Sequence, residues 1–131
     1  MEPVAEAYTF LFTDVEGSAA RWETRPDAMA AALQRHDQIL RSAIQGHSGH
    51  VFKTGGDSFC AAFRDPHEAL AAALAAQRDL AAVRWQAFGA GFEDLRVRMG
   101  LHTGTAEARG GDYFGPALNR TARLMGAGHG G

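Results

Sequence analysis

Apolar residues recur along this chain with two different periods, and the change of period separates predicted strands from predicted helices. Short apolar runs at residues 8–12, 50–54 and 58–63 have the length and composition of strands. Over residues 95–101 apolar side chains take every second position, which predicts a fourth strand with one buried face. The pattern therefore predicts four strands.

Two long segments carry apolar residues at spacings of three and four, which is typical of amphipathic helices. The first begins at Pro26 and ends at Gly46. Its predicted inner face consists of Met29, Leu33, His36, Leu40 and Ile44. The second begins with Asp65 as its cap and Pro66 as its first helical residue. Its predicted inner face consists of Ala69, Leu70, Ala73, Leu74, Gln77, Leu80 and Ala81.

Shorter signals complete the predicted order of elements. A helical turn is expected at 21–23, a loop at 85–93, a polar hairpin ending at Gly110-Gly111, and a last helix at 116–125. On that last helix Leu118, Ala122 and Met125 are expected to form the apolar face. The glycine-rich ending 126–131 is expected to be the turn into a further strand.

The order strand, helix, strand, strand, helix, strand is that of a ferredoxin-like fold. We therefore expect an α+β domain with a βαββαβ core, in which helices cover one face of an antiparallel sheet. A chain of 131 residues is sufficient for one such domain, spanning 1–131. Because no strand follows residue 131, the domain is expected to be incomplete at its C-terminal end.

Composition narrows the classes of function. The net charge of −2 gives no field that would gather nucleic acid or anionic lipid, so neither partner is expected. No signal peptide or membrane span is predicted, and the expected location is the cytoplasm. The single cysteine, Cys60, lies in an apolar run and is interpreted as a small core residue.

Two aspartates are candidates for a metal site. Asp14 follows the first predicted strand, and Asp57 lies in the tight hairpin at Gly55-Gly56-Asp57 between the second and third. In the expected fold those strands are neighbours at the sheet centre, so the two carboxylates approach each other. Close carboxylates repel unless a cation lies between them, which favours a divalent metal. The alternative is a pair of ordinary turn aspartates.

Gly17 and Ser18 lie where a helix begins, shortly after Asp14. Free amides at a helix start bind phosphate, and glycine lets the phosphate approach closely. The alternative is that Ser18 is only an N-cap.

Two further pairs of polar residues have a possible role. Asn119 and Arg123 lie four residues apart on the last predicted helix and therefore project from one face, where Arg123 could stabilise charge developing on a phosphate. Lys53 and Asp112 together offer one donor and one acceptor, the complement of the adenine N1 and N6 edge. The alternatives are a solvated helix face for the first pair and unrelated surface residues for the second.

Taken together, four ordered motifs resemble the catalytic domain of class III adenylyl/guanylyl cyclases. The resemblance extends over nearly the whole chain. The motifs are FTDVEGS at 12–18, FKTGGDSF at 52–59, LHTG at 101–104 and DYFGPALNRTARL at 112–124.

This resemblance implies roles for the metal ligands and for the assembly. Asp14 and Asp57 match the two aspartates that bind two divalent metal ions, Mg²⁺ or Mn²⁺, and the carbonyl of Val15 joins them. The family works as head-to-tail dimers, so a homodimer partner is expected to supply the remaining site residues.

Roles for the nucleotide-binding residues follow in the same way. Lys53 and Asp112 match the adenine-selecting pair, which implies ATP as substrate. Asn119 and Arg123 match the residues that orient the ribose and stabilise the transition state. The implied reaction is attack of the ribose 3′-oxygen on the α-phosphate, giving 3′,5′-cyclic AMP and pyrophosphate.

Two alternatives remain at this point. One is a catalytically weak or inactive nucleotide-binding or dimerisation module derived from a cyclase. The weaker one is a diguanylate cyclase, which also has a Gly-Gly-Asp hairpin but places glutamate where this chain has Ser58.

Overall fold

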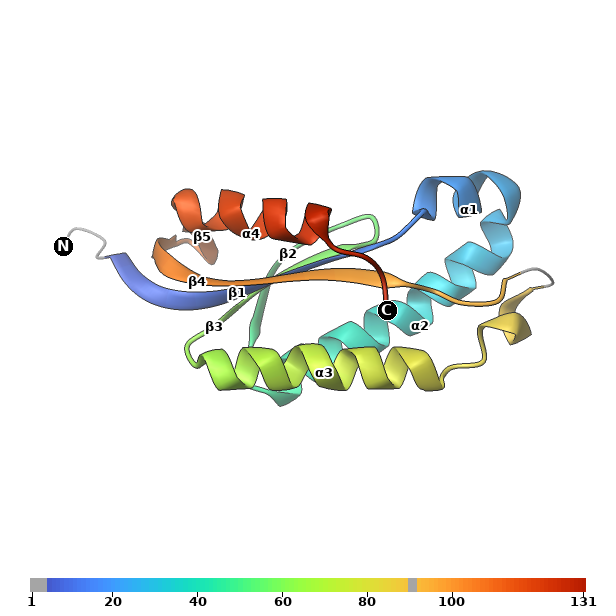
Figure 1. The fold of residues 1–131 in the computed structure, drawn as a ribbon, viewed down its shortest axis with the longest axis horizontal. Coiled ribbons are helices and arrows are strands. Elements are labelled where there is room, and N and C mark those ends of the chain that lie inside the picture. Colours follow the sequence, from blue (N-terminus) through green and yellow to red (C-terminus); the bar gives the residue numbers. More distant parts are fainter. Residues whose placement is uncertain (1–4, 90–91) are drawn as a thin grey trace.

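The computed structural model describes residues 5–89 and 92–131. A five-stranded antiparallel sheet has the strand order β2-β3-β1-β4-β5 (Figure 1). The strands are β1 (Ala5–Val15), β2 (His50–Gly55), β3 (Ser58–Phe63), β4 (Val97–Arg109) and β5 (Asp112–Phe114). The helices are α1 (Ser18–Thr24), α2 (Pro26–Gly46), α3 (Pro66–Ala82), the 3-10 helix η1 (Trp85–Phe88) and α4 (Pro116–Ala127).

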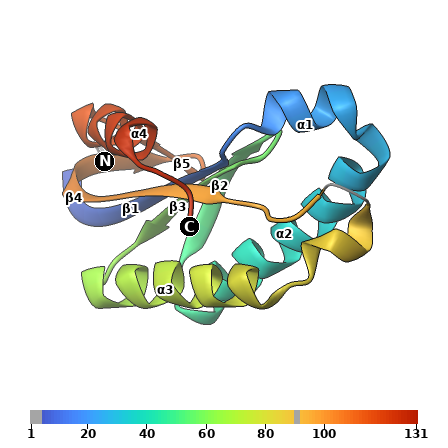
Figure 2. The same cartoon turned by 45° about the vertical axis from the view of Figure 1, so that its right-hand side comes forward.

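The predicted α+β, ferredoxin-like βαββαβ core is confirmed. Helices α2 and α3 lie together on one face of the sheet, as expected (Figures 1 and 2). Helix α4 lies on the opposite face, so the expectation of helices on one face holds for the core and not for this additional helix. The sheet is therefore covered on both sides.

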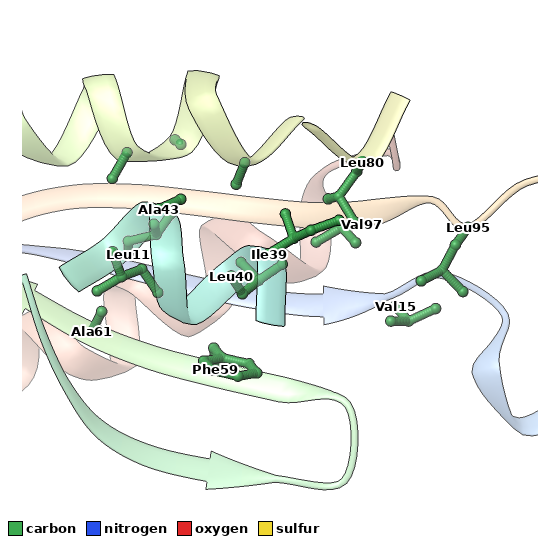
Figure 3. Packing of buried hydrophobic residues seen from close by; sticks show 14 of the residues in the cluster. Leu11, Val15, Ile39, Leu40, Ala43, Phe59, Ala61, Leu80, Leu95 and Val97 are labelled. Atoms are coloured by element: carbon green, nitrogen blue, oxygen red, sulfur yellow. The ribbon is translucent and has the colours of Figure 1, made fainter. Parts of the chain in front are cut away.

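The face under α2 and α3 holds the larger hydrophobic core. Side chains from the sheet, among them Leu11, Phe59 and Val97, pack against Leu40 and its neighbours on α2 (Figure 3). The predicted inner face of α2 is confirmed, since Met29, His36, Leu40 and Ile44 are buried and Leu33 packs partly against the core.

The predicted inner face of α3 is partly wrong. Leu70 and Leu74 are 50% and 52% exposed, and Ala81 is exposed too, whereas Ala72 and Ala76 are fully buried. Both rows of residues have helical spacing, so periodicity could not choose between them. A row of alanines lets the helix lie close to the sheet and to α2, which is the geometric reason for this rotation.

The opposite face is lined by aromatic side chains and covered by α4. Tyr8, Phe10 and Phe12 of β1 are buried here with Ala117 of α4. Ala122, predicted to belong to the apolar face of α4, is exposed, and the buried positions are Ala117 and Thr121. The helix lies so close to β4 that a Cβ on Gly100 would meet the Met125 amide nitrogen at 2.6 Å. Only glycine fits at this crossing.

Two strands are longer than predicted. β1 pairs with β4 continuously from Ala5↔Glu107 to Val15↔Val97, so the central strand extends past its apolar run in both directions. The strand predicted at 95–101 is β4, which begins at Val97 and continues to Arg109. Leu95 therefore lies just before the strand. Of the predicted loop at 85–93, residues 85–88 form η1, and 90 and 91 lie outside the described residues. The continuous pairing of β1 with β4 sustains polar residues within both strands, which periodicity does not anticipate.

The expected turn at Gly110-Gly111 connects β4 to β5, with both glycines at positive φ. Within the described ranges, no helix has both the length and the apolar character that crossing a membrane would require.

Candidate active site

The two candidate metal ligands lie at the same end of the sheet. β1 and β3 are hydrogen-bonded neighbours with Thr13 opposite Phe59, which places Asp14 beside the Gly55–Ser58 hairpin that carries Asp57. The sequence predicts Asp14 just after the first strand, but Asp14 lies within β1, where it pairs with Arg98 of the neighbouring β4. The expected proximity of the strands that carry Asp14 and Asp57 is thus present.

Arg98 is a residue of this corner that the sequence reading missed. Its Nη2 and Nε atoms lie 2.5 Å and 2.8 Å from the two carboxylate oxygens of Asp14. This two-point hydrogen bond raises the pKa of Arg98, and the charge of Asp57 contributes in the same direction. In the sequence Arg98 is only one of the polar positions of an alternating strand, so only the strand register could have identified it.

The donor set of this corner fits a hard divalent cation. One oxygen of Asp57, Oδ2, is buried and has no hydrogen-bond partner among the described residues. A buried carboxylate oxygen without a partner is costly, and a cation would satisfy it. Two carboxylates with the carbonyl of Val15 would give oxygen ligands of the kind that Mg²⁺ and Mn²⁺ prefer. In residues 5–89 and 92–131 there is no group of three or more His, Cys, Asp or Glu side chains suited to a metal.

The start of α1 follows directly from β1. Gly17 is the N-cap and adopts a left-handed conformation with φ 67°, which glycine tolerates readily. Ser18 is the first helical residue, so its interpretation as the N-cap is wrong. The role of these residues in phosphate binding stays a prediction.

Lys53 and Asp112 are brought together although their strands lie at opposite edges of the sheet. The Lys53 Nζ and Asp112 Oδ2 atoms are 3.9 Å apart. Cys60 lies across from Lys53 on β3 and is half-buried. Burial raises the pKa of its thiol, with Lys53 acting in the opposite direction, so Cys60 remains a neutral side chain beside the pair.

Asn119 and Arg123 are both exposed on α4, with the four-residue spacing expected of one face. In the described part of the chain neither side chain forms a hydrogen bond or an ion pair with the aspartates. Arg123 borders a shallow hollow with His102, Arg120 and Leu124. The protomer therefore presents these two residues to its surroundings and not to its own Asp14 corner.

Comparison with known proteins identifies the family. The sequence model of the protein family "Adenylate and Guanylate cyclase catalytic domain" matches residues 2–131. The chain belongs to this family. An uncharacterized protein of Mycobacterium tuberculosis is 40% identical over 98% of the chain, and the chain spans 42% of that relative's length. An adenylate cyclase of Lachancea kluyveri is 34% identical over 92% of the chain, which spans 8% of it.

Solved cyclase structures share this fold. An adenylate cyclase domain of Trypanosoma brucei, solved in a monomeric state, superposes with a TM-score of 0.85 at 27% identity over 95% of this chain and 70% of that one. The adenylyl cyclase CyaB of P. aeruginosa superposes with a TM-score of 0.86 at 22% identity, covering 99% of this chain and 76% of that one. The class III cyclase resemblance and the predicted fold are both confirmed.

Proposed function

We propose that this domain is an adenylate cyclase that converts ATP to 3′,5′-cyclic AMP and pyrophosphate. The observation that carries the choice of base is the 3.9 Å approach of Lys53 to Asp112. The ammonium group can donate to adenine N1, and the carboxylate can accept from the N6 amine. Guanine presents the opposite polarity on the same edge, so this pair would leave its groups unmatched.

Asp14, Asp57 and the carbonyl of Val15 would hold two divalent ions. Such ions, when bound, lower the pKa of the attacking ribose 3′-hydroxyl and neutralise charge on the triphosphate. Arg98 would compete with a cation for the carboxylate of Asp14, and it keeps positive charge at this corner in either case. The amides at Gly17 and Ser18, at the start of α1, would bind phosphate oxygens.

Asn119 and Arg123 would act from the partner subunit of a homodimer. Both are exposed on α4, and within the described residues neither forms a hydrogen bond or ion pair with Asp14 of its own protomer, which supports a site shared across two chains. In that arrangement Asn119 orients the ribose, and Arg123 donates to the oxygens on which charge gathers. A protomer by itself would hold only part of the site.

The direct test is product formation from ATP and from GTP in Mn²⁺, followed by mass spectrometry, for the wild type and for Lys53→Met. We expect cyclic AMP as the main product, and a loss of preference for ATP when the proposed donor to N1 is removed. Arg123→Ala is expected to lower turnover about 10²–10³-fold. Cyclic GMP as the main product, or no cyclic nucleotide from a folded protein, would refute the proposal.

The alternative of a weak or inactive nucleotide-binding or dimerisation module gives a distinct outcome in the same experiment. Such a module would bind ATP and self-associate without product. A diguanylate cyclase would form a cyclic dinucleotide from GTP, which mass spectrometry separates from cyclic GMP.

A further inference from the structure

Tyr113 connects the two edge strands of the sheet. In strand order β2 and β5 are the furthest apart, and among the described residues each has one hydrogen-bonded neighbour in the sheet. The ring of Tyr113 on β5 nevertheless lies 4.7 Å from the ring of Phe52 on β2, at an interplanar angle of 61°. The Tyr113 hydroxyl and His50 Nδ1, also on β2, are 3.1 Å apart.

The same ring packs on the central strand below it. Its centroid lies 5.0 Å from that of Tyr8 and 5.6 Å from that of Phe10, both in edge-to-face geometry. Such aromatic contacts are directional, so they determine the position of the ring as well as its burial. Tyr113 is therefore held from two sides, by β1 and by β2.

The contacts of Tyr113 determine where Asp112 and Lys53 lie. Each member of the charged pair directly adjoins a member of the aromatic pair, since Lys53 follows Phe52 and Asp112 precedes Tyr113. The amide of Tyr113 also donates to Asp112 Oδ1 at 2.7 Å, which leaves Oδ2 directed toward Lys53. The ion pair itself is exposed and weak, with 62% and 35% of the two side chains accessible. It cannot hold the edges together alone.

We propose that Tyr113 is a positioning residue for base selection: it keeps Lys53 and Asp112 at the separation that matches adenine. This inference rests on the proposed function, because it concerns the base-binding pair of that site. In this role Tyr113 would act through its contacts with Phe52, His50 and β1, and not on the reacting phosphate. Its loss should therefore change the discrimination between ATP and GTP more than the rate at saturating ATP.

The test compares Tyr113→Ala, Tyr113→Phe and Phe114→Ala in two assays: competition of ATP and GTP for a fluorescent ribose-labelled ATP analogue, and steady-state turnover with both nucleotides. Phe114 is the matched control, an adjacent aromatic residue of β5 that is 43% exposed and packs on Arg109. Thermal unfolding is measured for each variant. Tyr113→Leu, which retains apolar volume, replaces the alanine variant if that one does not fold.

For Tyr113→Ala we expect about a three- to tenfold weaker affinity and higher KM for ATP, with a similar loss of preference over GTP, since aromatic pairs contribute energies of that order. The kcat at saturating ATP should change less than twofold. Tyr113→Phe should retain most of the preference because the ring contacts remain, and Phe114→Ala should retain all of it.

The inference and the proposed function fail separately. Unchanged preference in Tyr113→Ala, or an equal loss in Phe114→Ala, would overturn the inference while cyclic AMP formation by the wild type stands. A wild type that binds ATP better than GTP but forms no cyclic AMP would overturn the proposed function. The binding preference of the variants would then still decide the role of Tyr113.

Discussion

The two faces of the sheet are built from different kinds of residue. Under α2 and α3 the core is mostly aliphatic, with alanines of α3 in contact with the sheet. The face under α4 is mainly aromatic, and the rings of Tyr8, Phe10, Phe52 and Tyr113 pack edge to face. The candidate base-binding residues Lys53 and Asp112 adjoin Phe52 and Tyr113 in the sequence. Asn119 and Arg123 are exposed on α4, the helix that covers this face.

Stability and candidate chemistry are therefore largely separated in this domain. The cluster of buried residues under α2 and α3 is hydrophobic, which suits a core. The α4 face carries charged residues at its rim and an ion pair between Asp14 and Arg98, half-buried at one end of the sheet. Substitutions of polar candidate-site residues and substitutions of core residues under α2 and α3 should consequently have opposite signatures in activity and in stability.

The largest expected effect is on activity, from Asp57→Asn. Loss of a metal-ligating charge should lower cyclic AMP formation by more than the roughly 10–100-fold typical of residues that only support a ligand. The melting temperature should be unchanged or slightly higher, because the buried Oδ2 atom of Asp57 has no hydrogen-bond partner among the described residues to lose. Activity within tenfold of the wild type, or a clearly lowered melting temperature, would contradict the separation of the two faces.

The next effect is on stability, from Leu40→Ala on α2. Leu40 is fully buried in the α2/α3 core, so this truncation should lower the free energy of unfolding by about 2–5 kcal/mol in urea titrations. The matched control is Leu74→Ala on α3, a residue that is 52% exposed. It should change stability by no more than about 0.5 kcal/mol. Equal losses in the two variants would mean that α3 is rotated from the position described.

A smaller loss is expected from Gly100→Ala, where β4 meets α4. The new methyl group would contact the α4 backbone at 2.6 Å and 2.8 Å, and relieving this overlap should cost about 1–3 kcal/mol of unfolding free energy. Gly46→Ala at the end of α2 is the control, since nothing lies within 4 Å of its Cβ position. That control should be neutral or stabilising by up to about 1 kcal/mol. A neutral Gly100→Ala would indicate that α4 does not pack this closely.

The smallest effect concerns pH and the ion pairs of Asp94. Hydrogen bonds from Arg96 and then Arg21 lower the pKa of Asp94. A carboxyl whose pKa is lower in the folded state stabilises the fold above its unfolded pKa, and this contribution is lost as the pH falls through the folded value. Asp94→Asn should therefore cost about 0.2–1 kcal/mol at pH 7, since the carboxylate is half exposed.

Urea unfolding of Asp94→Asn and the wild type at pH 7 and at successively lower pH values from about 4 downward measures this difference, which should shrink as the pH falls through the lowered pKa of Asp94. A difference that persists or grows on acidification would contradict the proposed direction of the pKa shift.

How much of the fold was predictable varies from element to element. The apolar face of α2 agrees with the prediction because its large apolar side chains gather on one face of the helix. On α3 both candidate rows contain alanine and leucine, so its orientation depended on the close packing against the sheet. The predicted strands were shorter than β1 and β4, because Thr13, Asp14 and Thr103 interrupt the apolar pattern but pair with neighbouring strands.

The candidate site divides in the same way. The motifs were sufficient to select four of the candidate residues. In the structure Asp14 lies beside the hairpin that carries Asp57. Lys53 and Asp112 approach each other from the two edge strands. Arg98 and Tyr113 could not be recognised as partners, since each looks like an ordinary strand residue until the register is known. The roles of Asn119 and Arg123 depend on a second subunit and stay predictions.

The kinds of element, the core βαββαβ order and the residues capable of chemistry can be predicted from the sequence, because periodicity and side-chain chemistry are local properties. The register that joins Arg98 to Asp14, the rotation of α3, the placement of α4 and the approach of Tyr113 to β2 became visible in the folded structure alone. Each of these depends on contacts between residues far apart in the chain, which no local pattern encodes.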